Sequence, residues 1–143
     1  MKKIIIINGP NLNLLGEREV ELYGSKTLKE IEIECCDIFK DEEISLDFFQ
    51  SNSESEIIDK IHISKNCDGM IINAGALTHT SIAIHDALKI VKIPKIEVHI
   101  SNIYNREEFR KNSFISPVVN GIIAGFGTHV YQVAINSLKY LQE

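Results

Sequence analysis

Short apolar runs rich in β-branched residues recur along the chain, and stretches with helical periodicity separate them. This alternation constrains the fold more than any other feature. The runs span residues 3–8, 44–50, 69–73, 95–100 and 121–126. Strands that are apolar on both faces are typical of a parallel sheet that helices cover on both sides. Because crossovers between parallel strands are right-handed, the pattern predicts an α/β fold: a flavodoxin-like, doubly wound, five-stranded parallel sheet with strand order 2-1-3-4-5.

The stretches between the runs have the spacing of amphipathic helices. Over residues 27–40 the apolar side chains fall on one helical face, and Thr27 and Glu30 have the spacing of a capping box. Further helices are predicted from Ser53 onwards, over residues 79–91 and 128–142, and as a short helix over residues 106–112 that Asn105 caps. No linker, repeat or low-complexity segment interrupts the chain, so we expect a single domain over residues 1–143.

Composition excludes several classes of protein. The formal net charge of −5 argues against a nucleic-acid binder, which usually carries a basic face. No apolar stretch approaches the roughly 18 residues that span a bilayer, and the apolar run near the N-terminus is too short for a signal peptide. The three cysteines, Cys35, Cys36 and Cys67, lack metal-ligand spacing, so we expect reduced thiols. These features predict a cytoplasmic protein that binds neither nucleic acid nor membrane.

Ligands of open α/β sheets bind beyond the carboxyl ends of the strands. In this chain those ends carry residues 8–11, 50–52, 73–75 and 99–102, which are rich in side-chain amides. We therefore expect a polar, hydrogen-bonding rim with few charges. Neither G-x-G-x-x-G after the first strand nor a P-loop occurs, and the lone Gly-x-Gly at residues 125–127 indicates a tight turn before a helix.

Two ionisable residues interrupt the fourth apolar run. The period of a strand places Glu97 and His99 on the same side of it. A carboxylate bonded to one ring nitrogen favours the imidazolium, so His99, near the strand end, is placed to act as a general acid. Structural pairs of this kind also occur in protein cores, and the two residues alone leave both interpretations open.

A charged segment bounded by glycines, residues 16–25, follows the first strand on the crevice side and is a candidate lid. It contains Arg18 and Tyr23. Because a neighbouring arginine favours the phenolate, Tyr23 is a candidate general base; two exposed loop residues are the alternative.

Cationic and hydroxyl side chains follow the fourth run. Arg106 and Arg110 lie four residues apart and are predicted to share a helix face. They either meet an anion at the crevice or belong to a solvated surface helix. Ser101 and the backbone N–H groups beside it can hold a carboxylate at the same place.

Taken together, these segments resemble the type II 3-dehydroquinate dehydratases. The matching stretches are NGPNLNLLGERE…LYG, INAGALTHTSIAIHDAL and IEVHISN…REEFR…SFISPV…GIIAGFG, which run from about residue 4 to the last helix. The family reversibly removes water from 3-dehydroquinate to give 3-dehydroshikimate, in the shikimate pathway or in quinate catabolism. The resemblance therefore implies a hydro-lyase that uses no metal and no organic cofactor.

The resemblance also implies a role for each motif residue. Tyr23 would take the proton beside the ketone, with Arg18 keeping it ionised, and Asn11 would help to stabilise the enolate through a bound water. His99, oriented by Glu97, would protonate the departing hydroxyl. Substrate binding would fall to Asn73, His79 and Arg110 at the ring hydroxyls and to Ile100 and Ser101 at the carboxylate, with Arg106 on the same side of the site.

Members of this family assemble as trimers that build a dodecamer, so the resemblance implies a homo-oligomer. The aspartate at the position of Asp86 reaches into a neighbouring subunit's site in the family. Ala74, Leu77 and His85 depart from residues that are frequent there, but they leave the base and the acid intact.

Two other functions stay open on the sequence alone. A flavodoxin-like module that binds a nucleotide or a flavin would carry an anion-binding loop after the first strand, and none is visible. A non-catalytic interaction domain would not require Tyr23, His99 and Glu97 to meet. Their placement around one crevice would count against it.

Overall fold

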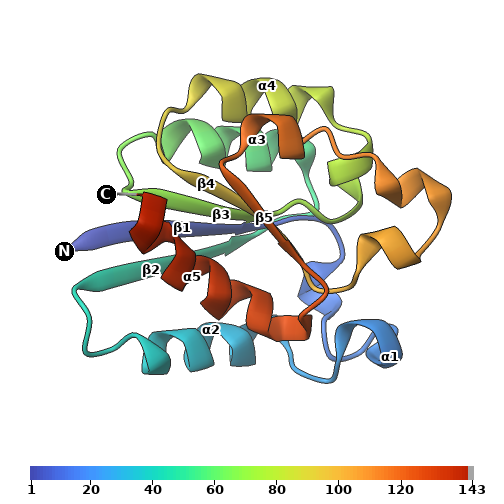
Figure 1. Cartoon of the computed structure of the whole chain (residues 1–143), viewed down its shortest axis with the longest axis horizontal. Coiled ribbons are helices and arrows are strands. Elements are labelled where there is room, and N and C mark those ends of the chain that lie inside the picture. Colours follow the sequence, from blue (N-terminus) through green and yellow to red (C-terminus); the bar gives the residue numbers. More distant parts are fainter. Residues whose placement is uncertain (142–143) are drawn as a thin grey trace.

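A single parallel sheet runs through the computed structural model, which describes residues 1–141 (Figure 1). Its strands are β1 (Lys2–Asn8), β2 (Ile44–Gln50), β3 (Gly69–Asn73), β4 (Lys95–His99) and β5 (Gly121–Ala124). They lie in the order β2-β1-β3-β4-β5, and every neighbouring pair is parallel. The predicted fold class and strand order are confirmed.

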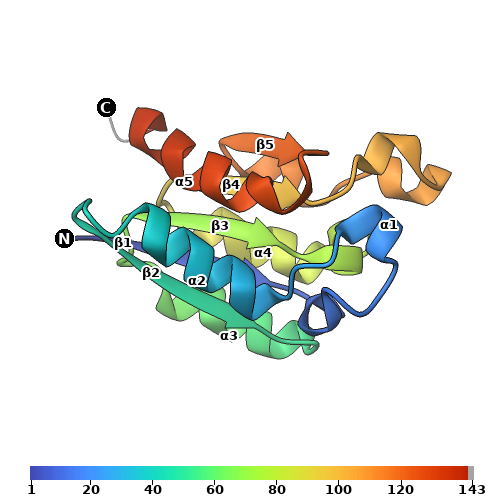
Figure 2. The same ribbon diagram turned by 90° about the horizontal axis from the view of Figure 1, so that it is seen from below.

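Helices cover both faces of the sheet. The α-helices of the structure are α1 (Val20–Tyr23), α2 (Leu28–Ile38), α3 (Glu54–Ile63), α4 (Ile82–Ile90) and α5 (Val130–Leu141). The loops contain short 3-10 turns: η1 (Leu12–Leu14), η2 (Gly75–His79), η3 (Ile103–Asn105), η4 (Glu108–Lys111), η5 (Ser116–Val118) and η6 (Gly127–His129). Helices α2 and α5 pack on one face, and α3 and α4 pack on the other (Figures 1 and 2). No helix within residues 1–141 is long and apolar enough to cross a membrane.

The isoleucines of β1 show why the sheet needs both layers. Ile4 and Ile6 belong to the core against α2 and α5, whereas Ile5 and Ile7 belong to the core against α3 and α4. All four side chains are buried. Because alternate residues of a strand point to opposite faces, a strand that is apolar throughout is stable only between two covering layers.

Three helices begin at hydroxyl caps. The side chains of Thr27, Ser53 and Ser81 accept hydrogen bonds from the backbone N–H groups at the starts of α2, α3 and α4. The predicted caps at Thr27 and Ser53 are confirmed. The third helix was predicted to begin at residue 79. In the structure Ser81 caps α4, which begins at Ile82, and His79 is the last residue of η2. The predicted last helix reached Gln142, which lies outside the described residues.

The predicted short helix over residues 106–112 was wrong. The chain forms two 3-10 turns instead, and Arg106 lies between them with extended backbone (φ −127°, ψ −158°). Asn102 rather than Asn105 supplies a cap, since its side chain accepts the N–H of Tyr104. A segment this short gains too little from helical hydrogen bonds alone to form a helix without an apolar face to bury.

The loops that follow β1 and β3 pack against each other at the centre of the sheet's carboxyl edge. The Gly9 N–H donates to the carbonyl of Asn73 at 2.7 Å. A side chain at position 9 would collide with the carbonyl oxygen of Ala74, so only glycine allows this approach. The contact brings the segment that follows Gly9 beside the end of β3.

Tyr131, on α5, is hydrogen-bonded to the last residues of both β1 and β3. Its hydroxyl donates to Asn8 Oδ1 at 2.6 Å and accepts from Asn73 Nδ2 at 3.0 Å, with the side chain 0% exposed. Burial raises the pKa of Tyr131, so the hydroxyl stays protonated and remains a donor. Asn8, which was expected in the polar rim, is therefore a buried structural residue.

Removing the Tyr131 hydroxyl is expected to destabilise the fold. In Tyr131→Phe the buried amides of Asn8 and Asn73 lose a partner, which costs about 1–3 kcal/mol in the free energy of unfolding. Urea denaturation followed by circular dichroism measures the loss. The matched control is Tyr140→Phe on the exposed side of α5, which should change stability by less than about 0.5 kcal/mol. Equal stability of the two variants would contradict this account of the strand ends.

Candidate active site

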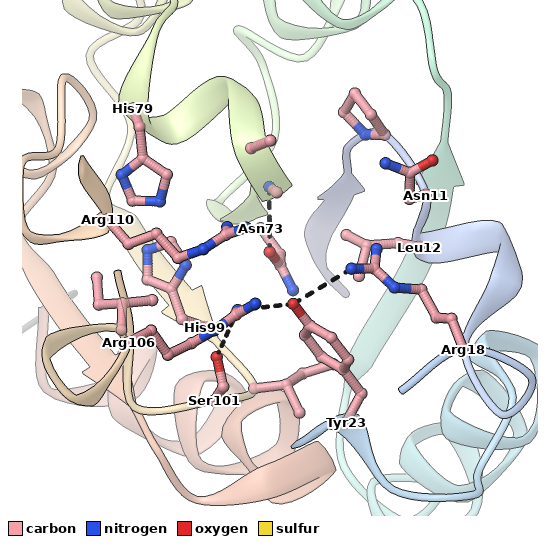
Figure 3. Close-up of a pocket in the computed structure, with 15 residues that line it drawn as sticks. Asn11, Leu12, Arg18, Tyr23, Asn73, His79, His99, Ser101, Arg106 and Arg110 are labelled. Carbon is pink, nitrogen blue, oxygen red and sulfur yellow. Dashed lines mark hydrogen bonds between the residues drawn. The ribbon is translucent and has the colours of Figure 1, made fainter. Parts of the chain in front are cut away.

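A pocket lies at the carboxyl ends of the strands and gathers side chains from four separate parts of the chain (Figure 3). The predicted site residues that line it are Asn11, Arg18, Tyr23, Asn73, His79, His99, Ile100, Ser101, Arg106 and Arg110. They come from the segment after β1, the candidate lid, the end of β3 with η2, and the chain from the end of β4 to η4. This is the crevice position expected for a doubly wound sheet.

Two arginines hold the phenol oxygen of Tyr23, which is half-buried at the end of α1. Arg106 Nη1 donates to it at 2.7 Å, and Arg18 Nη2 donates at 3.3 Å (Figure 3). Both guanidinium groups also lie over the ring, at 4.5 Å for Arg18 and 5.4 Å for Arg106. The phenol oxygen of Tyr23 thus accepts hydrogen bonds from two cationic side chains. The sequence pointed to Arg18, but the shorter bond comes from Arg106, 83 residues away.

Arg106 also links the candidate lid to the far wall of the pocket. Its Nη1 donates to Ser101 Oγ at 3.2 Å, and its Nη2 lies 3.8 Å from the Glu19 carboxylate. Glu19 has a left-handed backbone (φ 32°) at the start of α1. The segment at residues 16–25 thus lies against the pocket and is held there partly by an arginine from another segment.

Glu97 and His99 form a buried pair. His99 Nε2 lies 2.6 Å from Glu97 Oε2, and the two residues are 5% and 1% exposed. A carboxylate only accepts, so Nε2 carries the hydrogen, and Nδ1 is left for the pocket. Burial alone would raise the pKa of Glu97, but hydrogen bonds from His99, Ser116 and Ser113 outweigh it and hold the pKa below its ordinary value. The interior carboxylate is therefore charged.

His79 stacks beside His99, with ring centroids 6.4 Å apart. Its Nδ1 lies 2.7 Å from the carbonyl oxygen of Asn112, so Nδ1 is the donor. Burial lowers the pKa of His79, which favours the neutral ring. In that form Nε2 has a free lone pair and can accept a hydrogen bond from a hydroxyl in the pocket.

The expected rim of amides with few charges was wrong in two respects. Three arginines line the pocket: Arg18, Arg106 and Arg110. The amides at the end of β2 support the neighbouring loop instead: Gln50 Nε2 donates to the Gly9 carbonyl, and Asn52 Oδ1 accepts the Asn11 N–H at 2.9 Å. The amides of Gln50 and Asn52 therefore support the loop, whereas those of Asn11 and Asn73 line the pocket with the arginines.

Two predicted site residues do not line the pocket. Glu97 lies behind His99 and reaches the pocket only through it. Asp86 is exposed on α4, outside the pocket of its own chain. Within residues 1–141, no cluster of histidine, cysteine, aspartate and glutamate side chains is arranged to hold a metal ion.

Sequence reasoning missed several residues of the site. The apolar wall includes Leu12, Ala76 and Ile103. These positions lie next to predicted polar positions, which is the only signal that marks them. Ser113 and Ser116, the donors to Glu97, lie in a loop whose sequence gives no sign that it folds back over β4. Tyr23 and His99 line one pocket, with Glu97 bonded behind His99, and this counts against a non-catalytic interaction domain.

Comparison with known proteins gives a consistent result. A family model described as Dehydroquinase class II matches residues 2–139. The 3-dehydroquinate dehydratase of Prochlorococcus marinus strain MIT 9515 is 57% identical over 141 residues, which cover 97% of each chain. That of Caldicellulosiruptor saccharolyticus is 57% identical over 143 residues, again 97% of each chain. The crystal structure of the type II dehydroquinase from Butyrivibrio crossotus matches with a TM-score of 0.94 at 48% identity, covering 96% of this chain and 97% of that one.

The lowered pKa of Glu97 predicts a pH-dependent contribution to stability. A depressed carboxyl pKa stabilises the folded state fully above the ordinary glutamate value of about 4.3, and this stability is lost as pH falls through the folded value. The difference in free energy of unfolding between the wild type and Glu97→Gln should therefore be larger near about pH 7 than near about pH 3. Denaturant titrations across this range test it, with the exposed Glu43→Gln as the control. A gap that does not change with pH would show that Glu97 is not held as a charge.

Proposed function

Because this chain belongs to the class II dehydroquinase family and is a type II 3-dehydroquinate dehydratase, a hydro-lyase of the shikimate pathway, we propose that Tyr23 and His99 are its catalytic base and acid. One observation carries the proposal. A tyrosine held by two arginines and a histidine held by a buried carboxylate line the same pocket. The reaction needs one group of each kind.

The base acts first. The proton beside the ketone of 3-dehydroquinate is weakly acidic, so its removal needs both a positioned base and stabilisation of the enolate. Tyr23 takes this proton on its phenol oxygen, and the C–H electron pair moves to form the enolate. Arg18 and Arg106 favour the phenolate before the transfer. Asn11, at the pocket wall, stabilises the enolate through a bound water.

The acid completes the dehydration. Hydroxide is a poor leaving group, so the departing hydroxyl must receive a proton as its C–O bond breaks. His99 supplies that proton from Nδ1, while its Nε2–H remains hydrogen-bonded to Glu97. The enolate electrons form the new C=C bond of the conjugated enone, 3-dehydroshikimate. One proton is taken and one is given, so water leaves without a cofactor.

The remaining polar groups orient the substrate. Asn73, His79 and Arg110 bind its ring hydroxyls, and the neutral His79 acts as an acceptor there. Ile100 and Ser101 hold the carboxylate through backbone N–H groups and the Ser101 hydroxyl. Arg106 donates to Ser101 and Tyr23, so it adds positive charge between the anion and the base.

We further propose a cytoplasmic homo-oligomer, a dodecamer built of trimers. Asp86 would then enter the pocket of a neighbouring subunit. Its exposure on α4 between the exposed side chains of Ile82 and Ile90 supports this, because exposed apolar side chains around a polar group are typical of a subunit interface.

The base and acid are tested by enone absorbance. Purified wild-type protein mixed with 3-dehydroquinate should give a rapid rise in ultraviolet absorbance. Tyr23→Phe and His99→Ala should each lower kcat by about 10²–10⁴-fold. The exposed Tyr104→Phe serves as the matched tyrosine control. Activity that survives Tyr23→Phe would keep the reaction but exclude Tyr23 as the base.

Site sharing between subunits is tested by mixing inactive variants. If Asp86 completes a neighbouring pocket, Asp86→Ala should be inactive, and co-refolding it with Tyr23→Phe should restore activity. Random assembly would repair about a quarter of the pockets, because each needs an intact Tyr23 and a neighbour with an intact Asp86. Sedimentation of each mixture checks that the twelve-chain assembly is retained. An assembled mixture without activity would contradict the shared site.

A further inference from the structure

We propose that Ser113 and Ser116 are positioning residues for the acid, and that they act on His99 through Glu97. This inference rests on the proposed function, because it assigns a purpose to the surroundings of the Glu97–His99 pair. Both serines lie in the segment of residues 112–116, which crosses behind β4 and ends at η5. Neither serine lines the pocket.

The hydroxyl of Ser113 has only one direction in which to donate. Its Oγ accepts the backbone N–H groups of Ile115 and Ser116, each at 3.0 Å. Those two bonds occupy its lone pairs, so its single proton is directed to Glu97 Oε2, 2.9 Å away. The backbone of the segment thereby orients the donor.

The second serine fixes the other carboxylate oxygen. Ser116 Oγ donates to Glu97 Oε1, while Oε2 accepts from Ser113 and from His99. With a donor on each oxygen, the carboxylate cannot rotate away from His99 without losing hydrogen bonds inside the core. The orientation of the imidazole therefore depends on two residues that lie outside the pocket lining and act through Glu97.

The two serine donors are uncharged, and this matters as much as their position. A cation beside Glu97 would offset its negative charge next to His99, whereas hydroxyl donors stabilise the carboxylate and leave its charge in place. Lys95, the other charged side chain on this side of β4, has partners other than Glu97. Its ammonium donates to the carbonyls of Val91 and Ile93, beyond the opposite end of the strand.

The segment is itself anchored to η2 and α4. The Phe114 N–H donates to the Thr78 carbonyl at 2.9 Å, and His85 Nδ1 lies 2.6 Å from the Phe114 carbonyl. The carbonyl of Asn112 receives the bond from His79 Nδ1. One short stretch of chain thus holds the acid through its serines and the neighbouring histidine through its backbone.

Ser116→Ala is the informative substitution, because it removes one donor to Glu97 without leaving a backbone group unpaired. We expect kcat to fall about 10-fold with KM nearly unchanged, since the loss of one hydrogen bond to a charged group changes an equilibrium by roughly 10-fold or more. Ser137→Ala on α5, whose hydroxyl bonds only to its own helix, is the matched control and should leave both constants unchanged. Sedimentation and circular dichroism confirm that each variant is folded and assembled.

A double-mutant cycle distinguishes positioning from a structural effect. If Ser116 acts through Glu97, then Ser116→Ala should have no further effect on kcat in a Glu97→Gln background. Independent losses in the two variants, or a fall in kcat/KM that arises from KM alone, would overturn the proposal. So would an assembled Ser116→Ala enzyme with wild-type kcat.

The cycle also separates this inference from the proposed function. If Glu97→Gln alone retains full activity, the acid pair itself is wrong. If Glu97→Gln is impaired while Ser116→Ala is not, the acid pair stands and the role of the serines is refuted. Ser113→Ala gives a second measurement, and its loss should likewise appear in kcat.

Discussion

Much of this structure depends on a single buried negative charge, that of the Glu97 carboxylate. Glu97 is 1% exposed in the middle of a parallel sheet, where an unpaired carboxylate would cost far more than one side chain can contribute to stability. The chain offsets that cost with three donors, of which His99 is one. The other two require that residues 112–116 fold back over β4 beside α4 (Figure 1). The irregular stretch between β4 and β5 is thus where the charge is stabilised.

The same arrangement separates two kinds of electrostatics within a small volume. Around Glu97 the two serine donors are neutral hydroxyls, and the lowered pKa of Glu97 keeps a negative charge beside His99. Around Tyr23 the donors are charged instead, since two guanidinium groups bond to its phenol oxygen. The proposed base thus lies among positive charges and the proposed acid beside a negative one, which suits a reaction that takes one proton from carbon and gives one to a departing hydroxyl.

Much of the fold follows from the sequence, because the isoleucine runs and hydroxyl caps act locally. The unbroken apolar run in residues 3–8 is enough to predict a sheet covered on both faces, and strand order follows from the handedness of the crossovers. The site was predicted less completely. Neighbouring positions such as Glu97 and His99 reveal their pairing through strand period, but Arg106 reaches Tyr23 across 83 residues, and no local pattern encodes that contact. The predicted helix at residues 106–112 failed because the segment follows tertiary contacts rather than its own propensity.

The bond between Asn8 and Tyr131 joins residues 123 positions apart, so it spans most of the chain. During synthesis β1 emerges first and α5 last. The ends of β1 and β3 therefore lack their hydrogen bonds to Tyr131 until nearly the whole polypeptide is available. Contacts of such long sequence separation form late and slowly, because the chain between them must be ordered first. A chain that ends before α5 therefore has no hydroxyl to join the ends of β1 and β3 beneath the pocket.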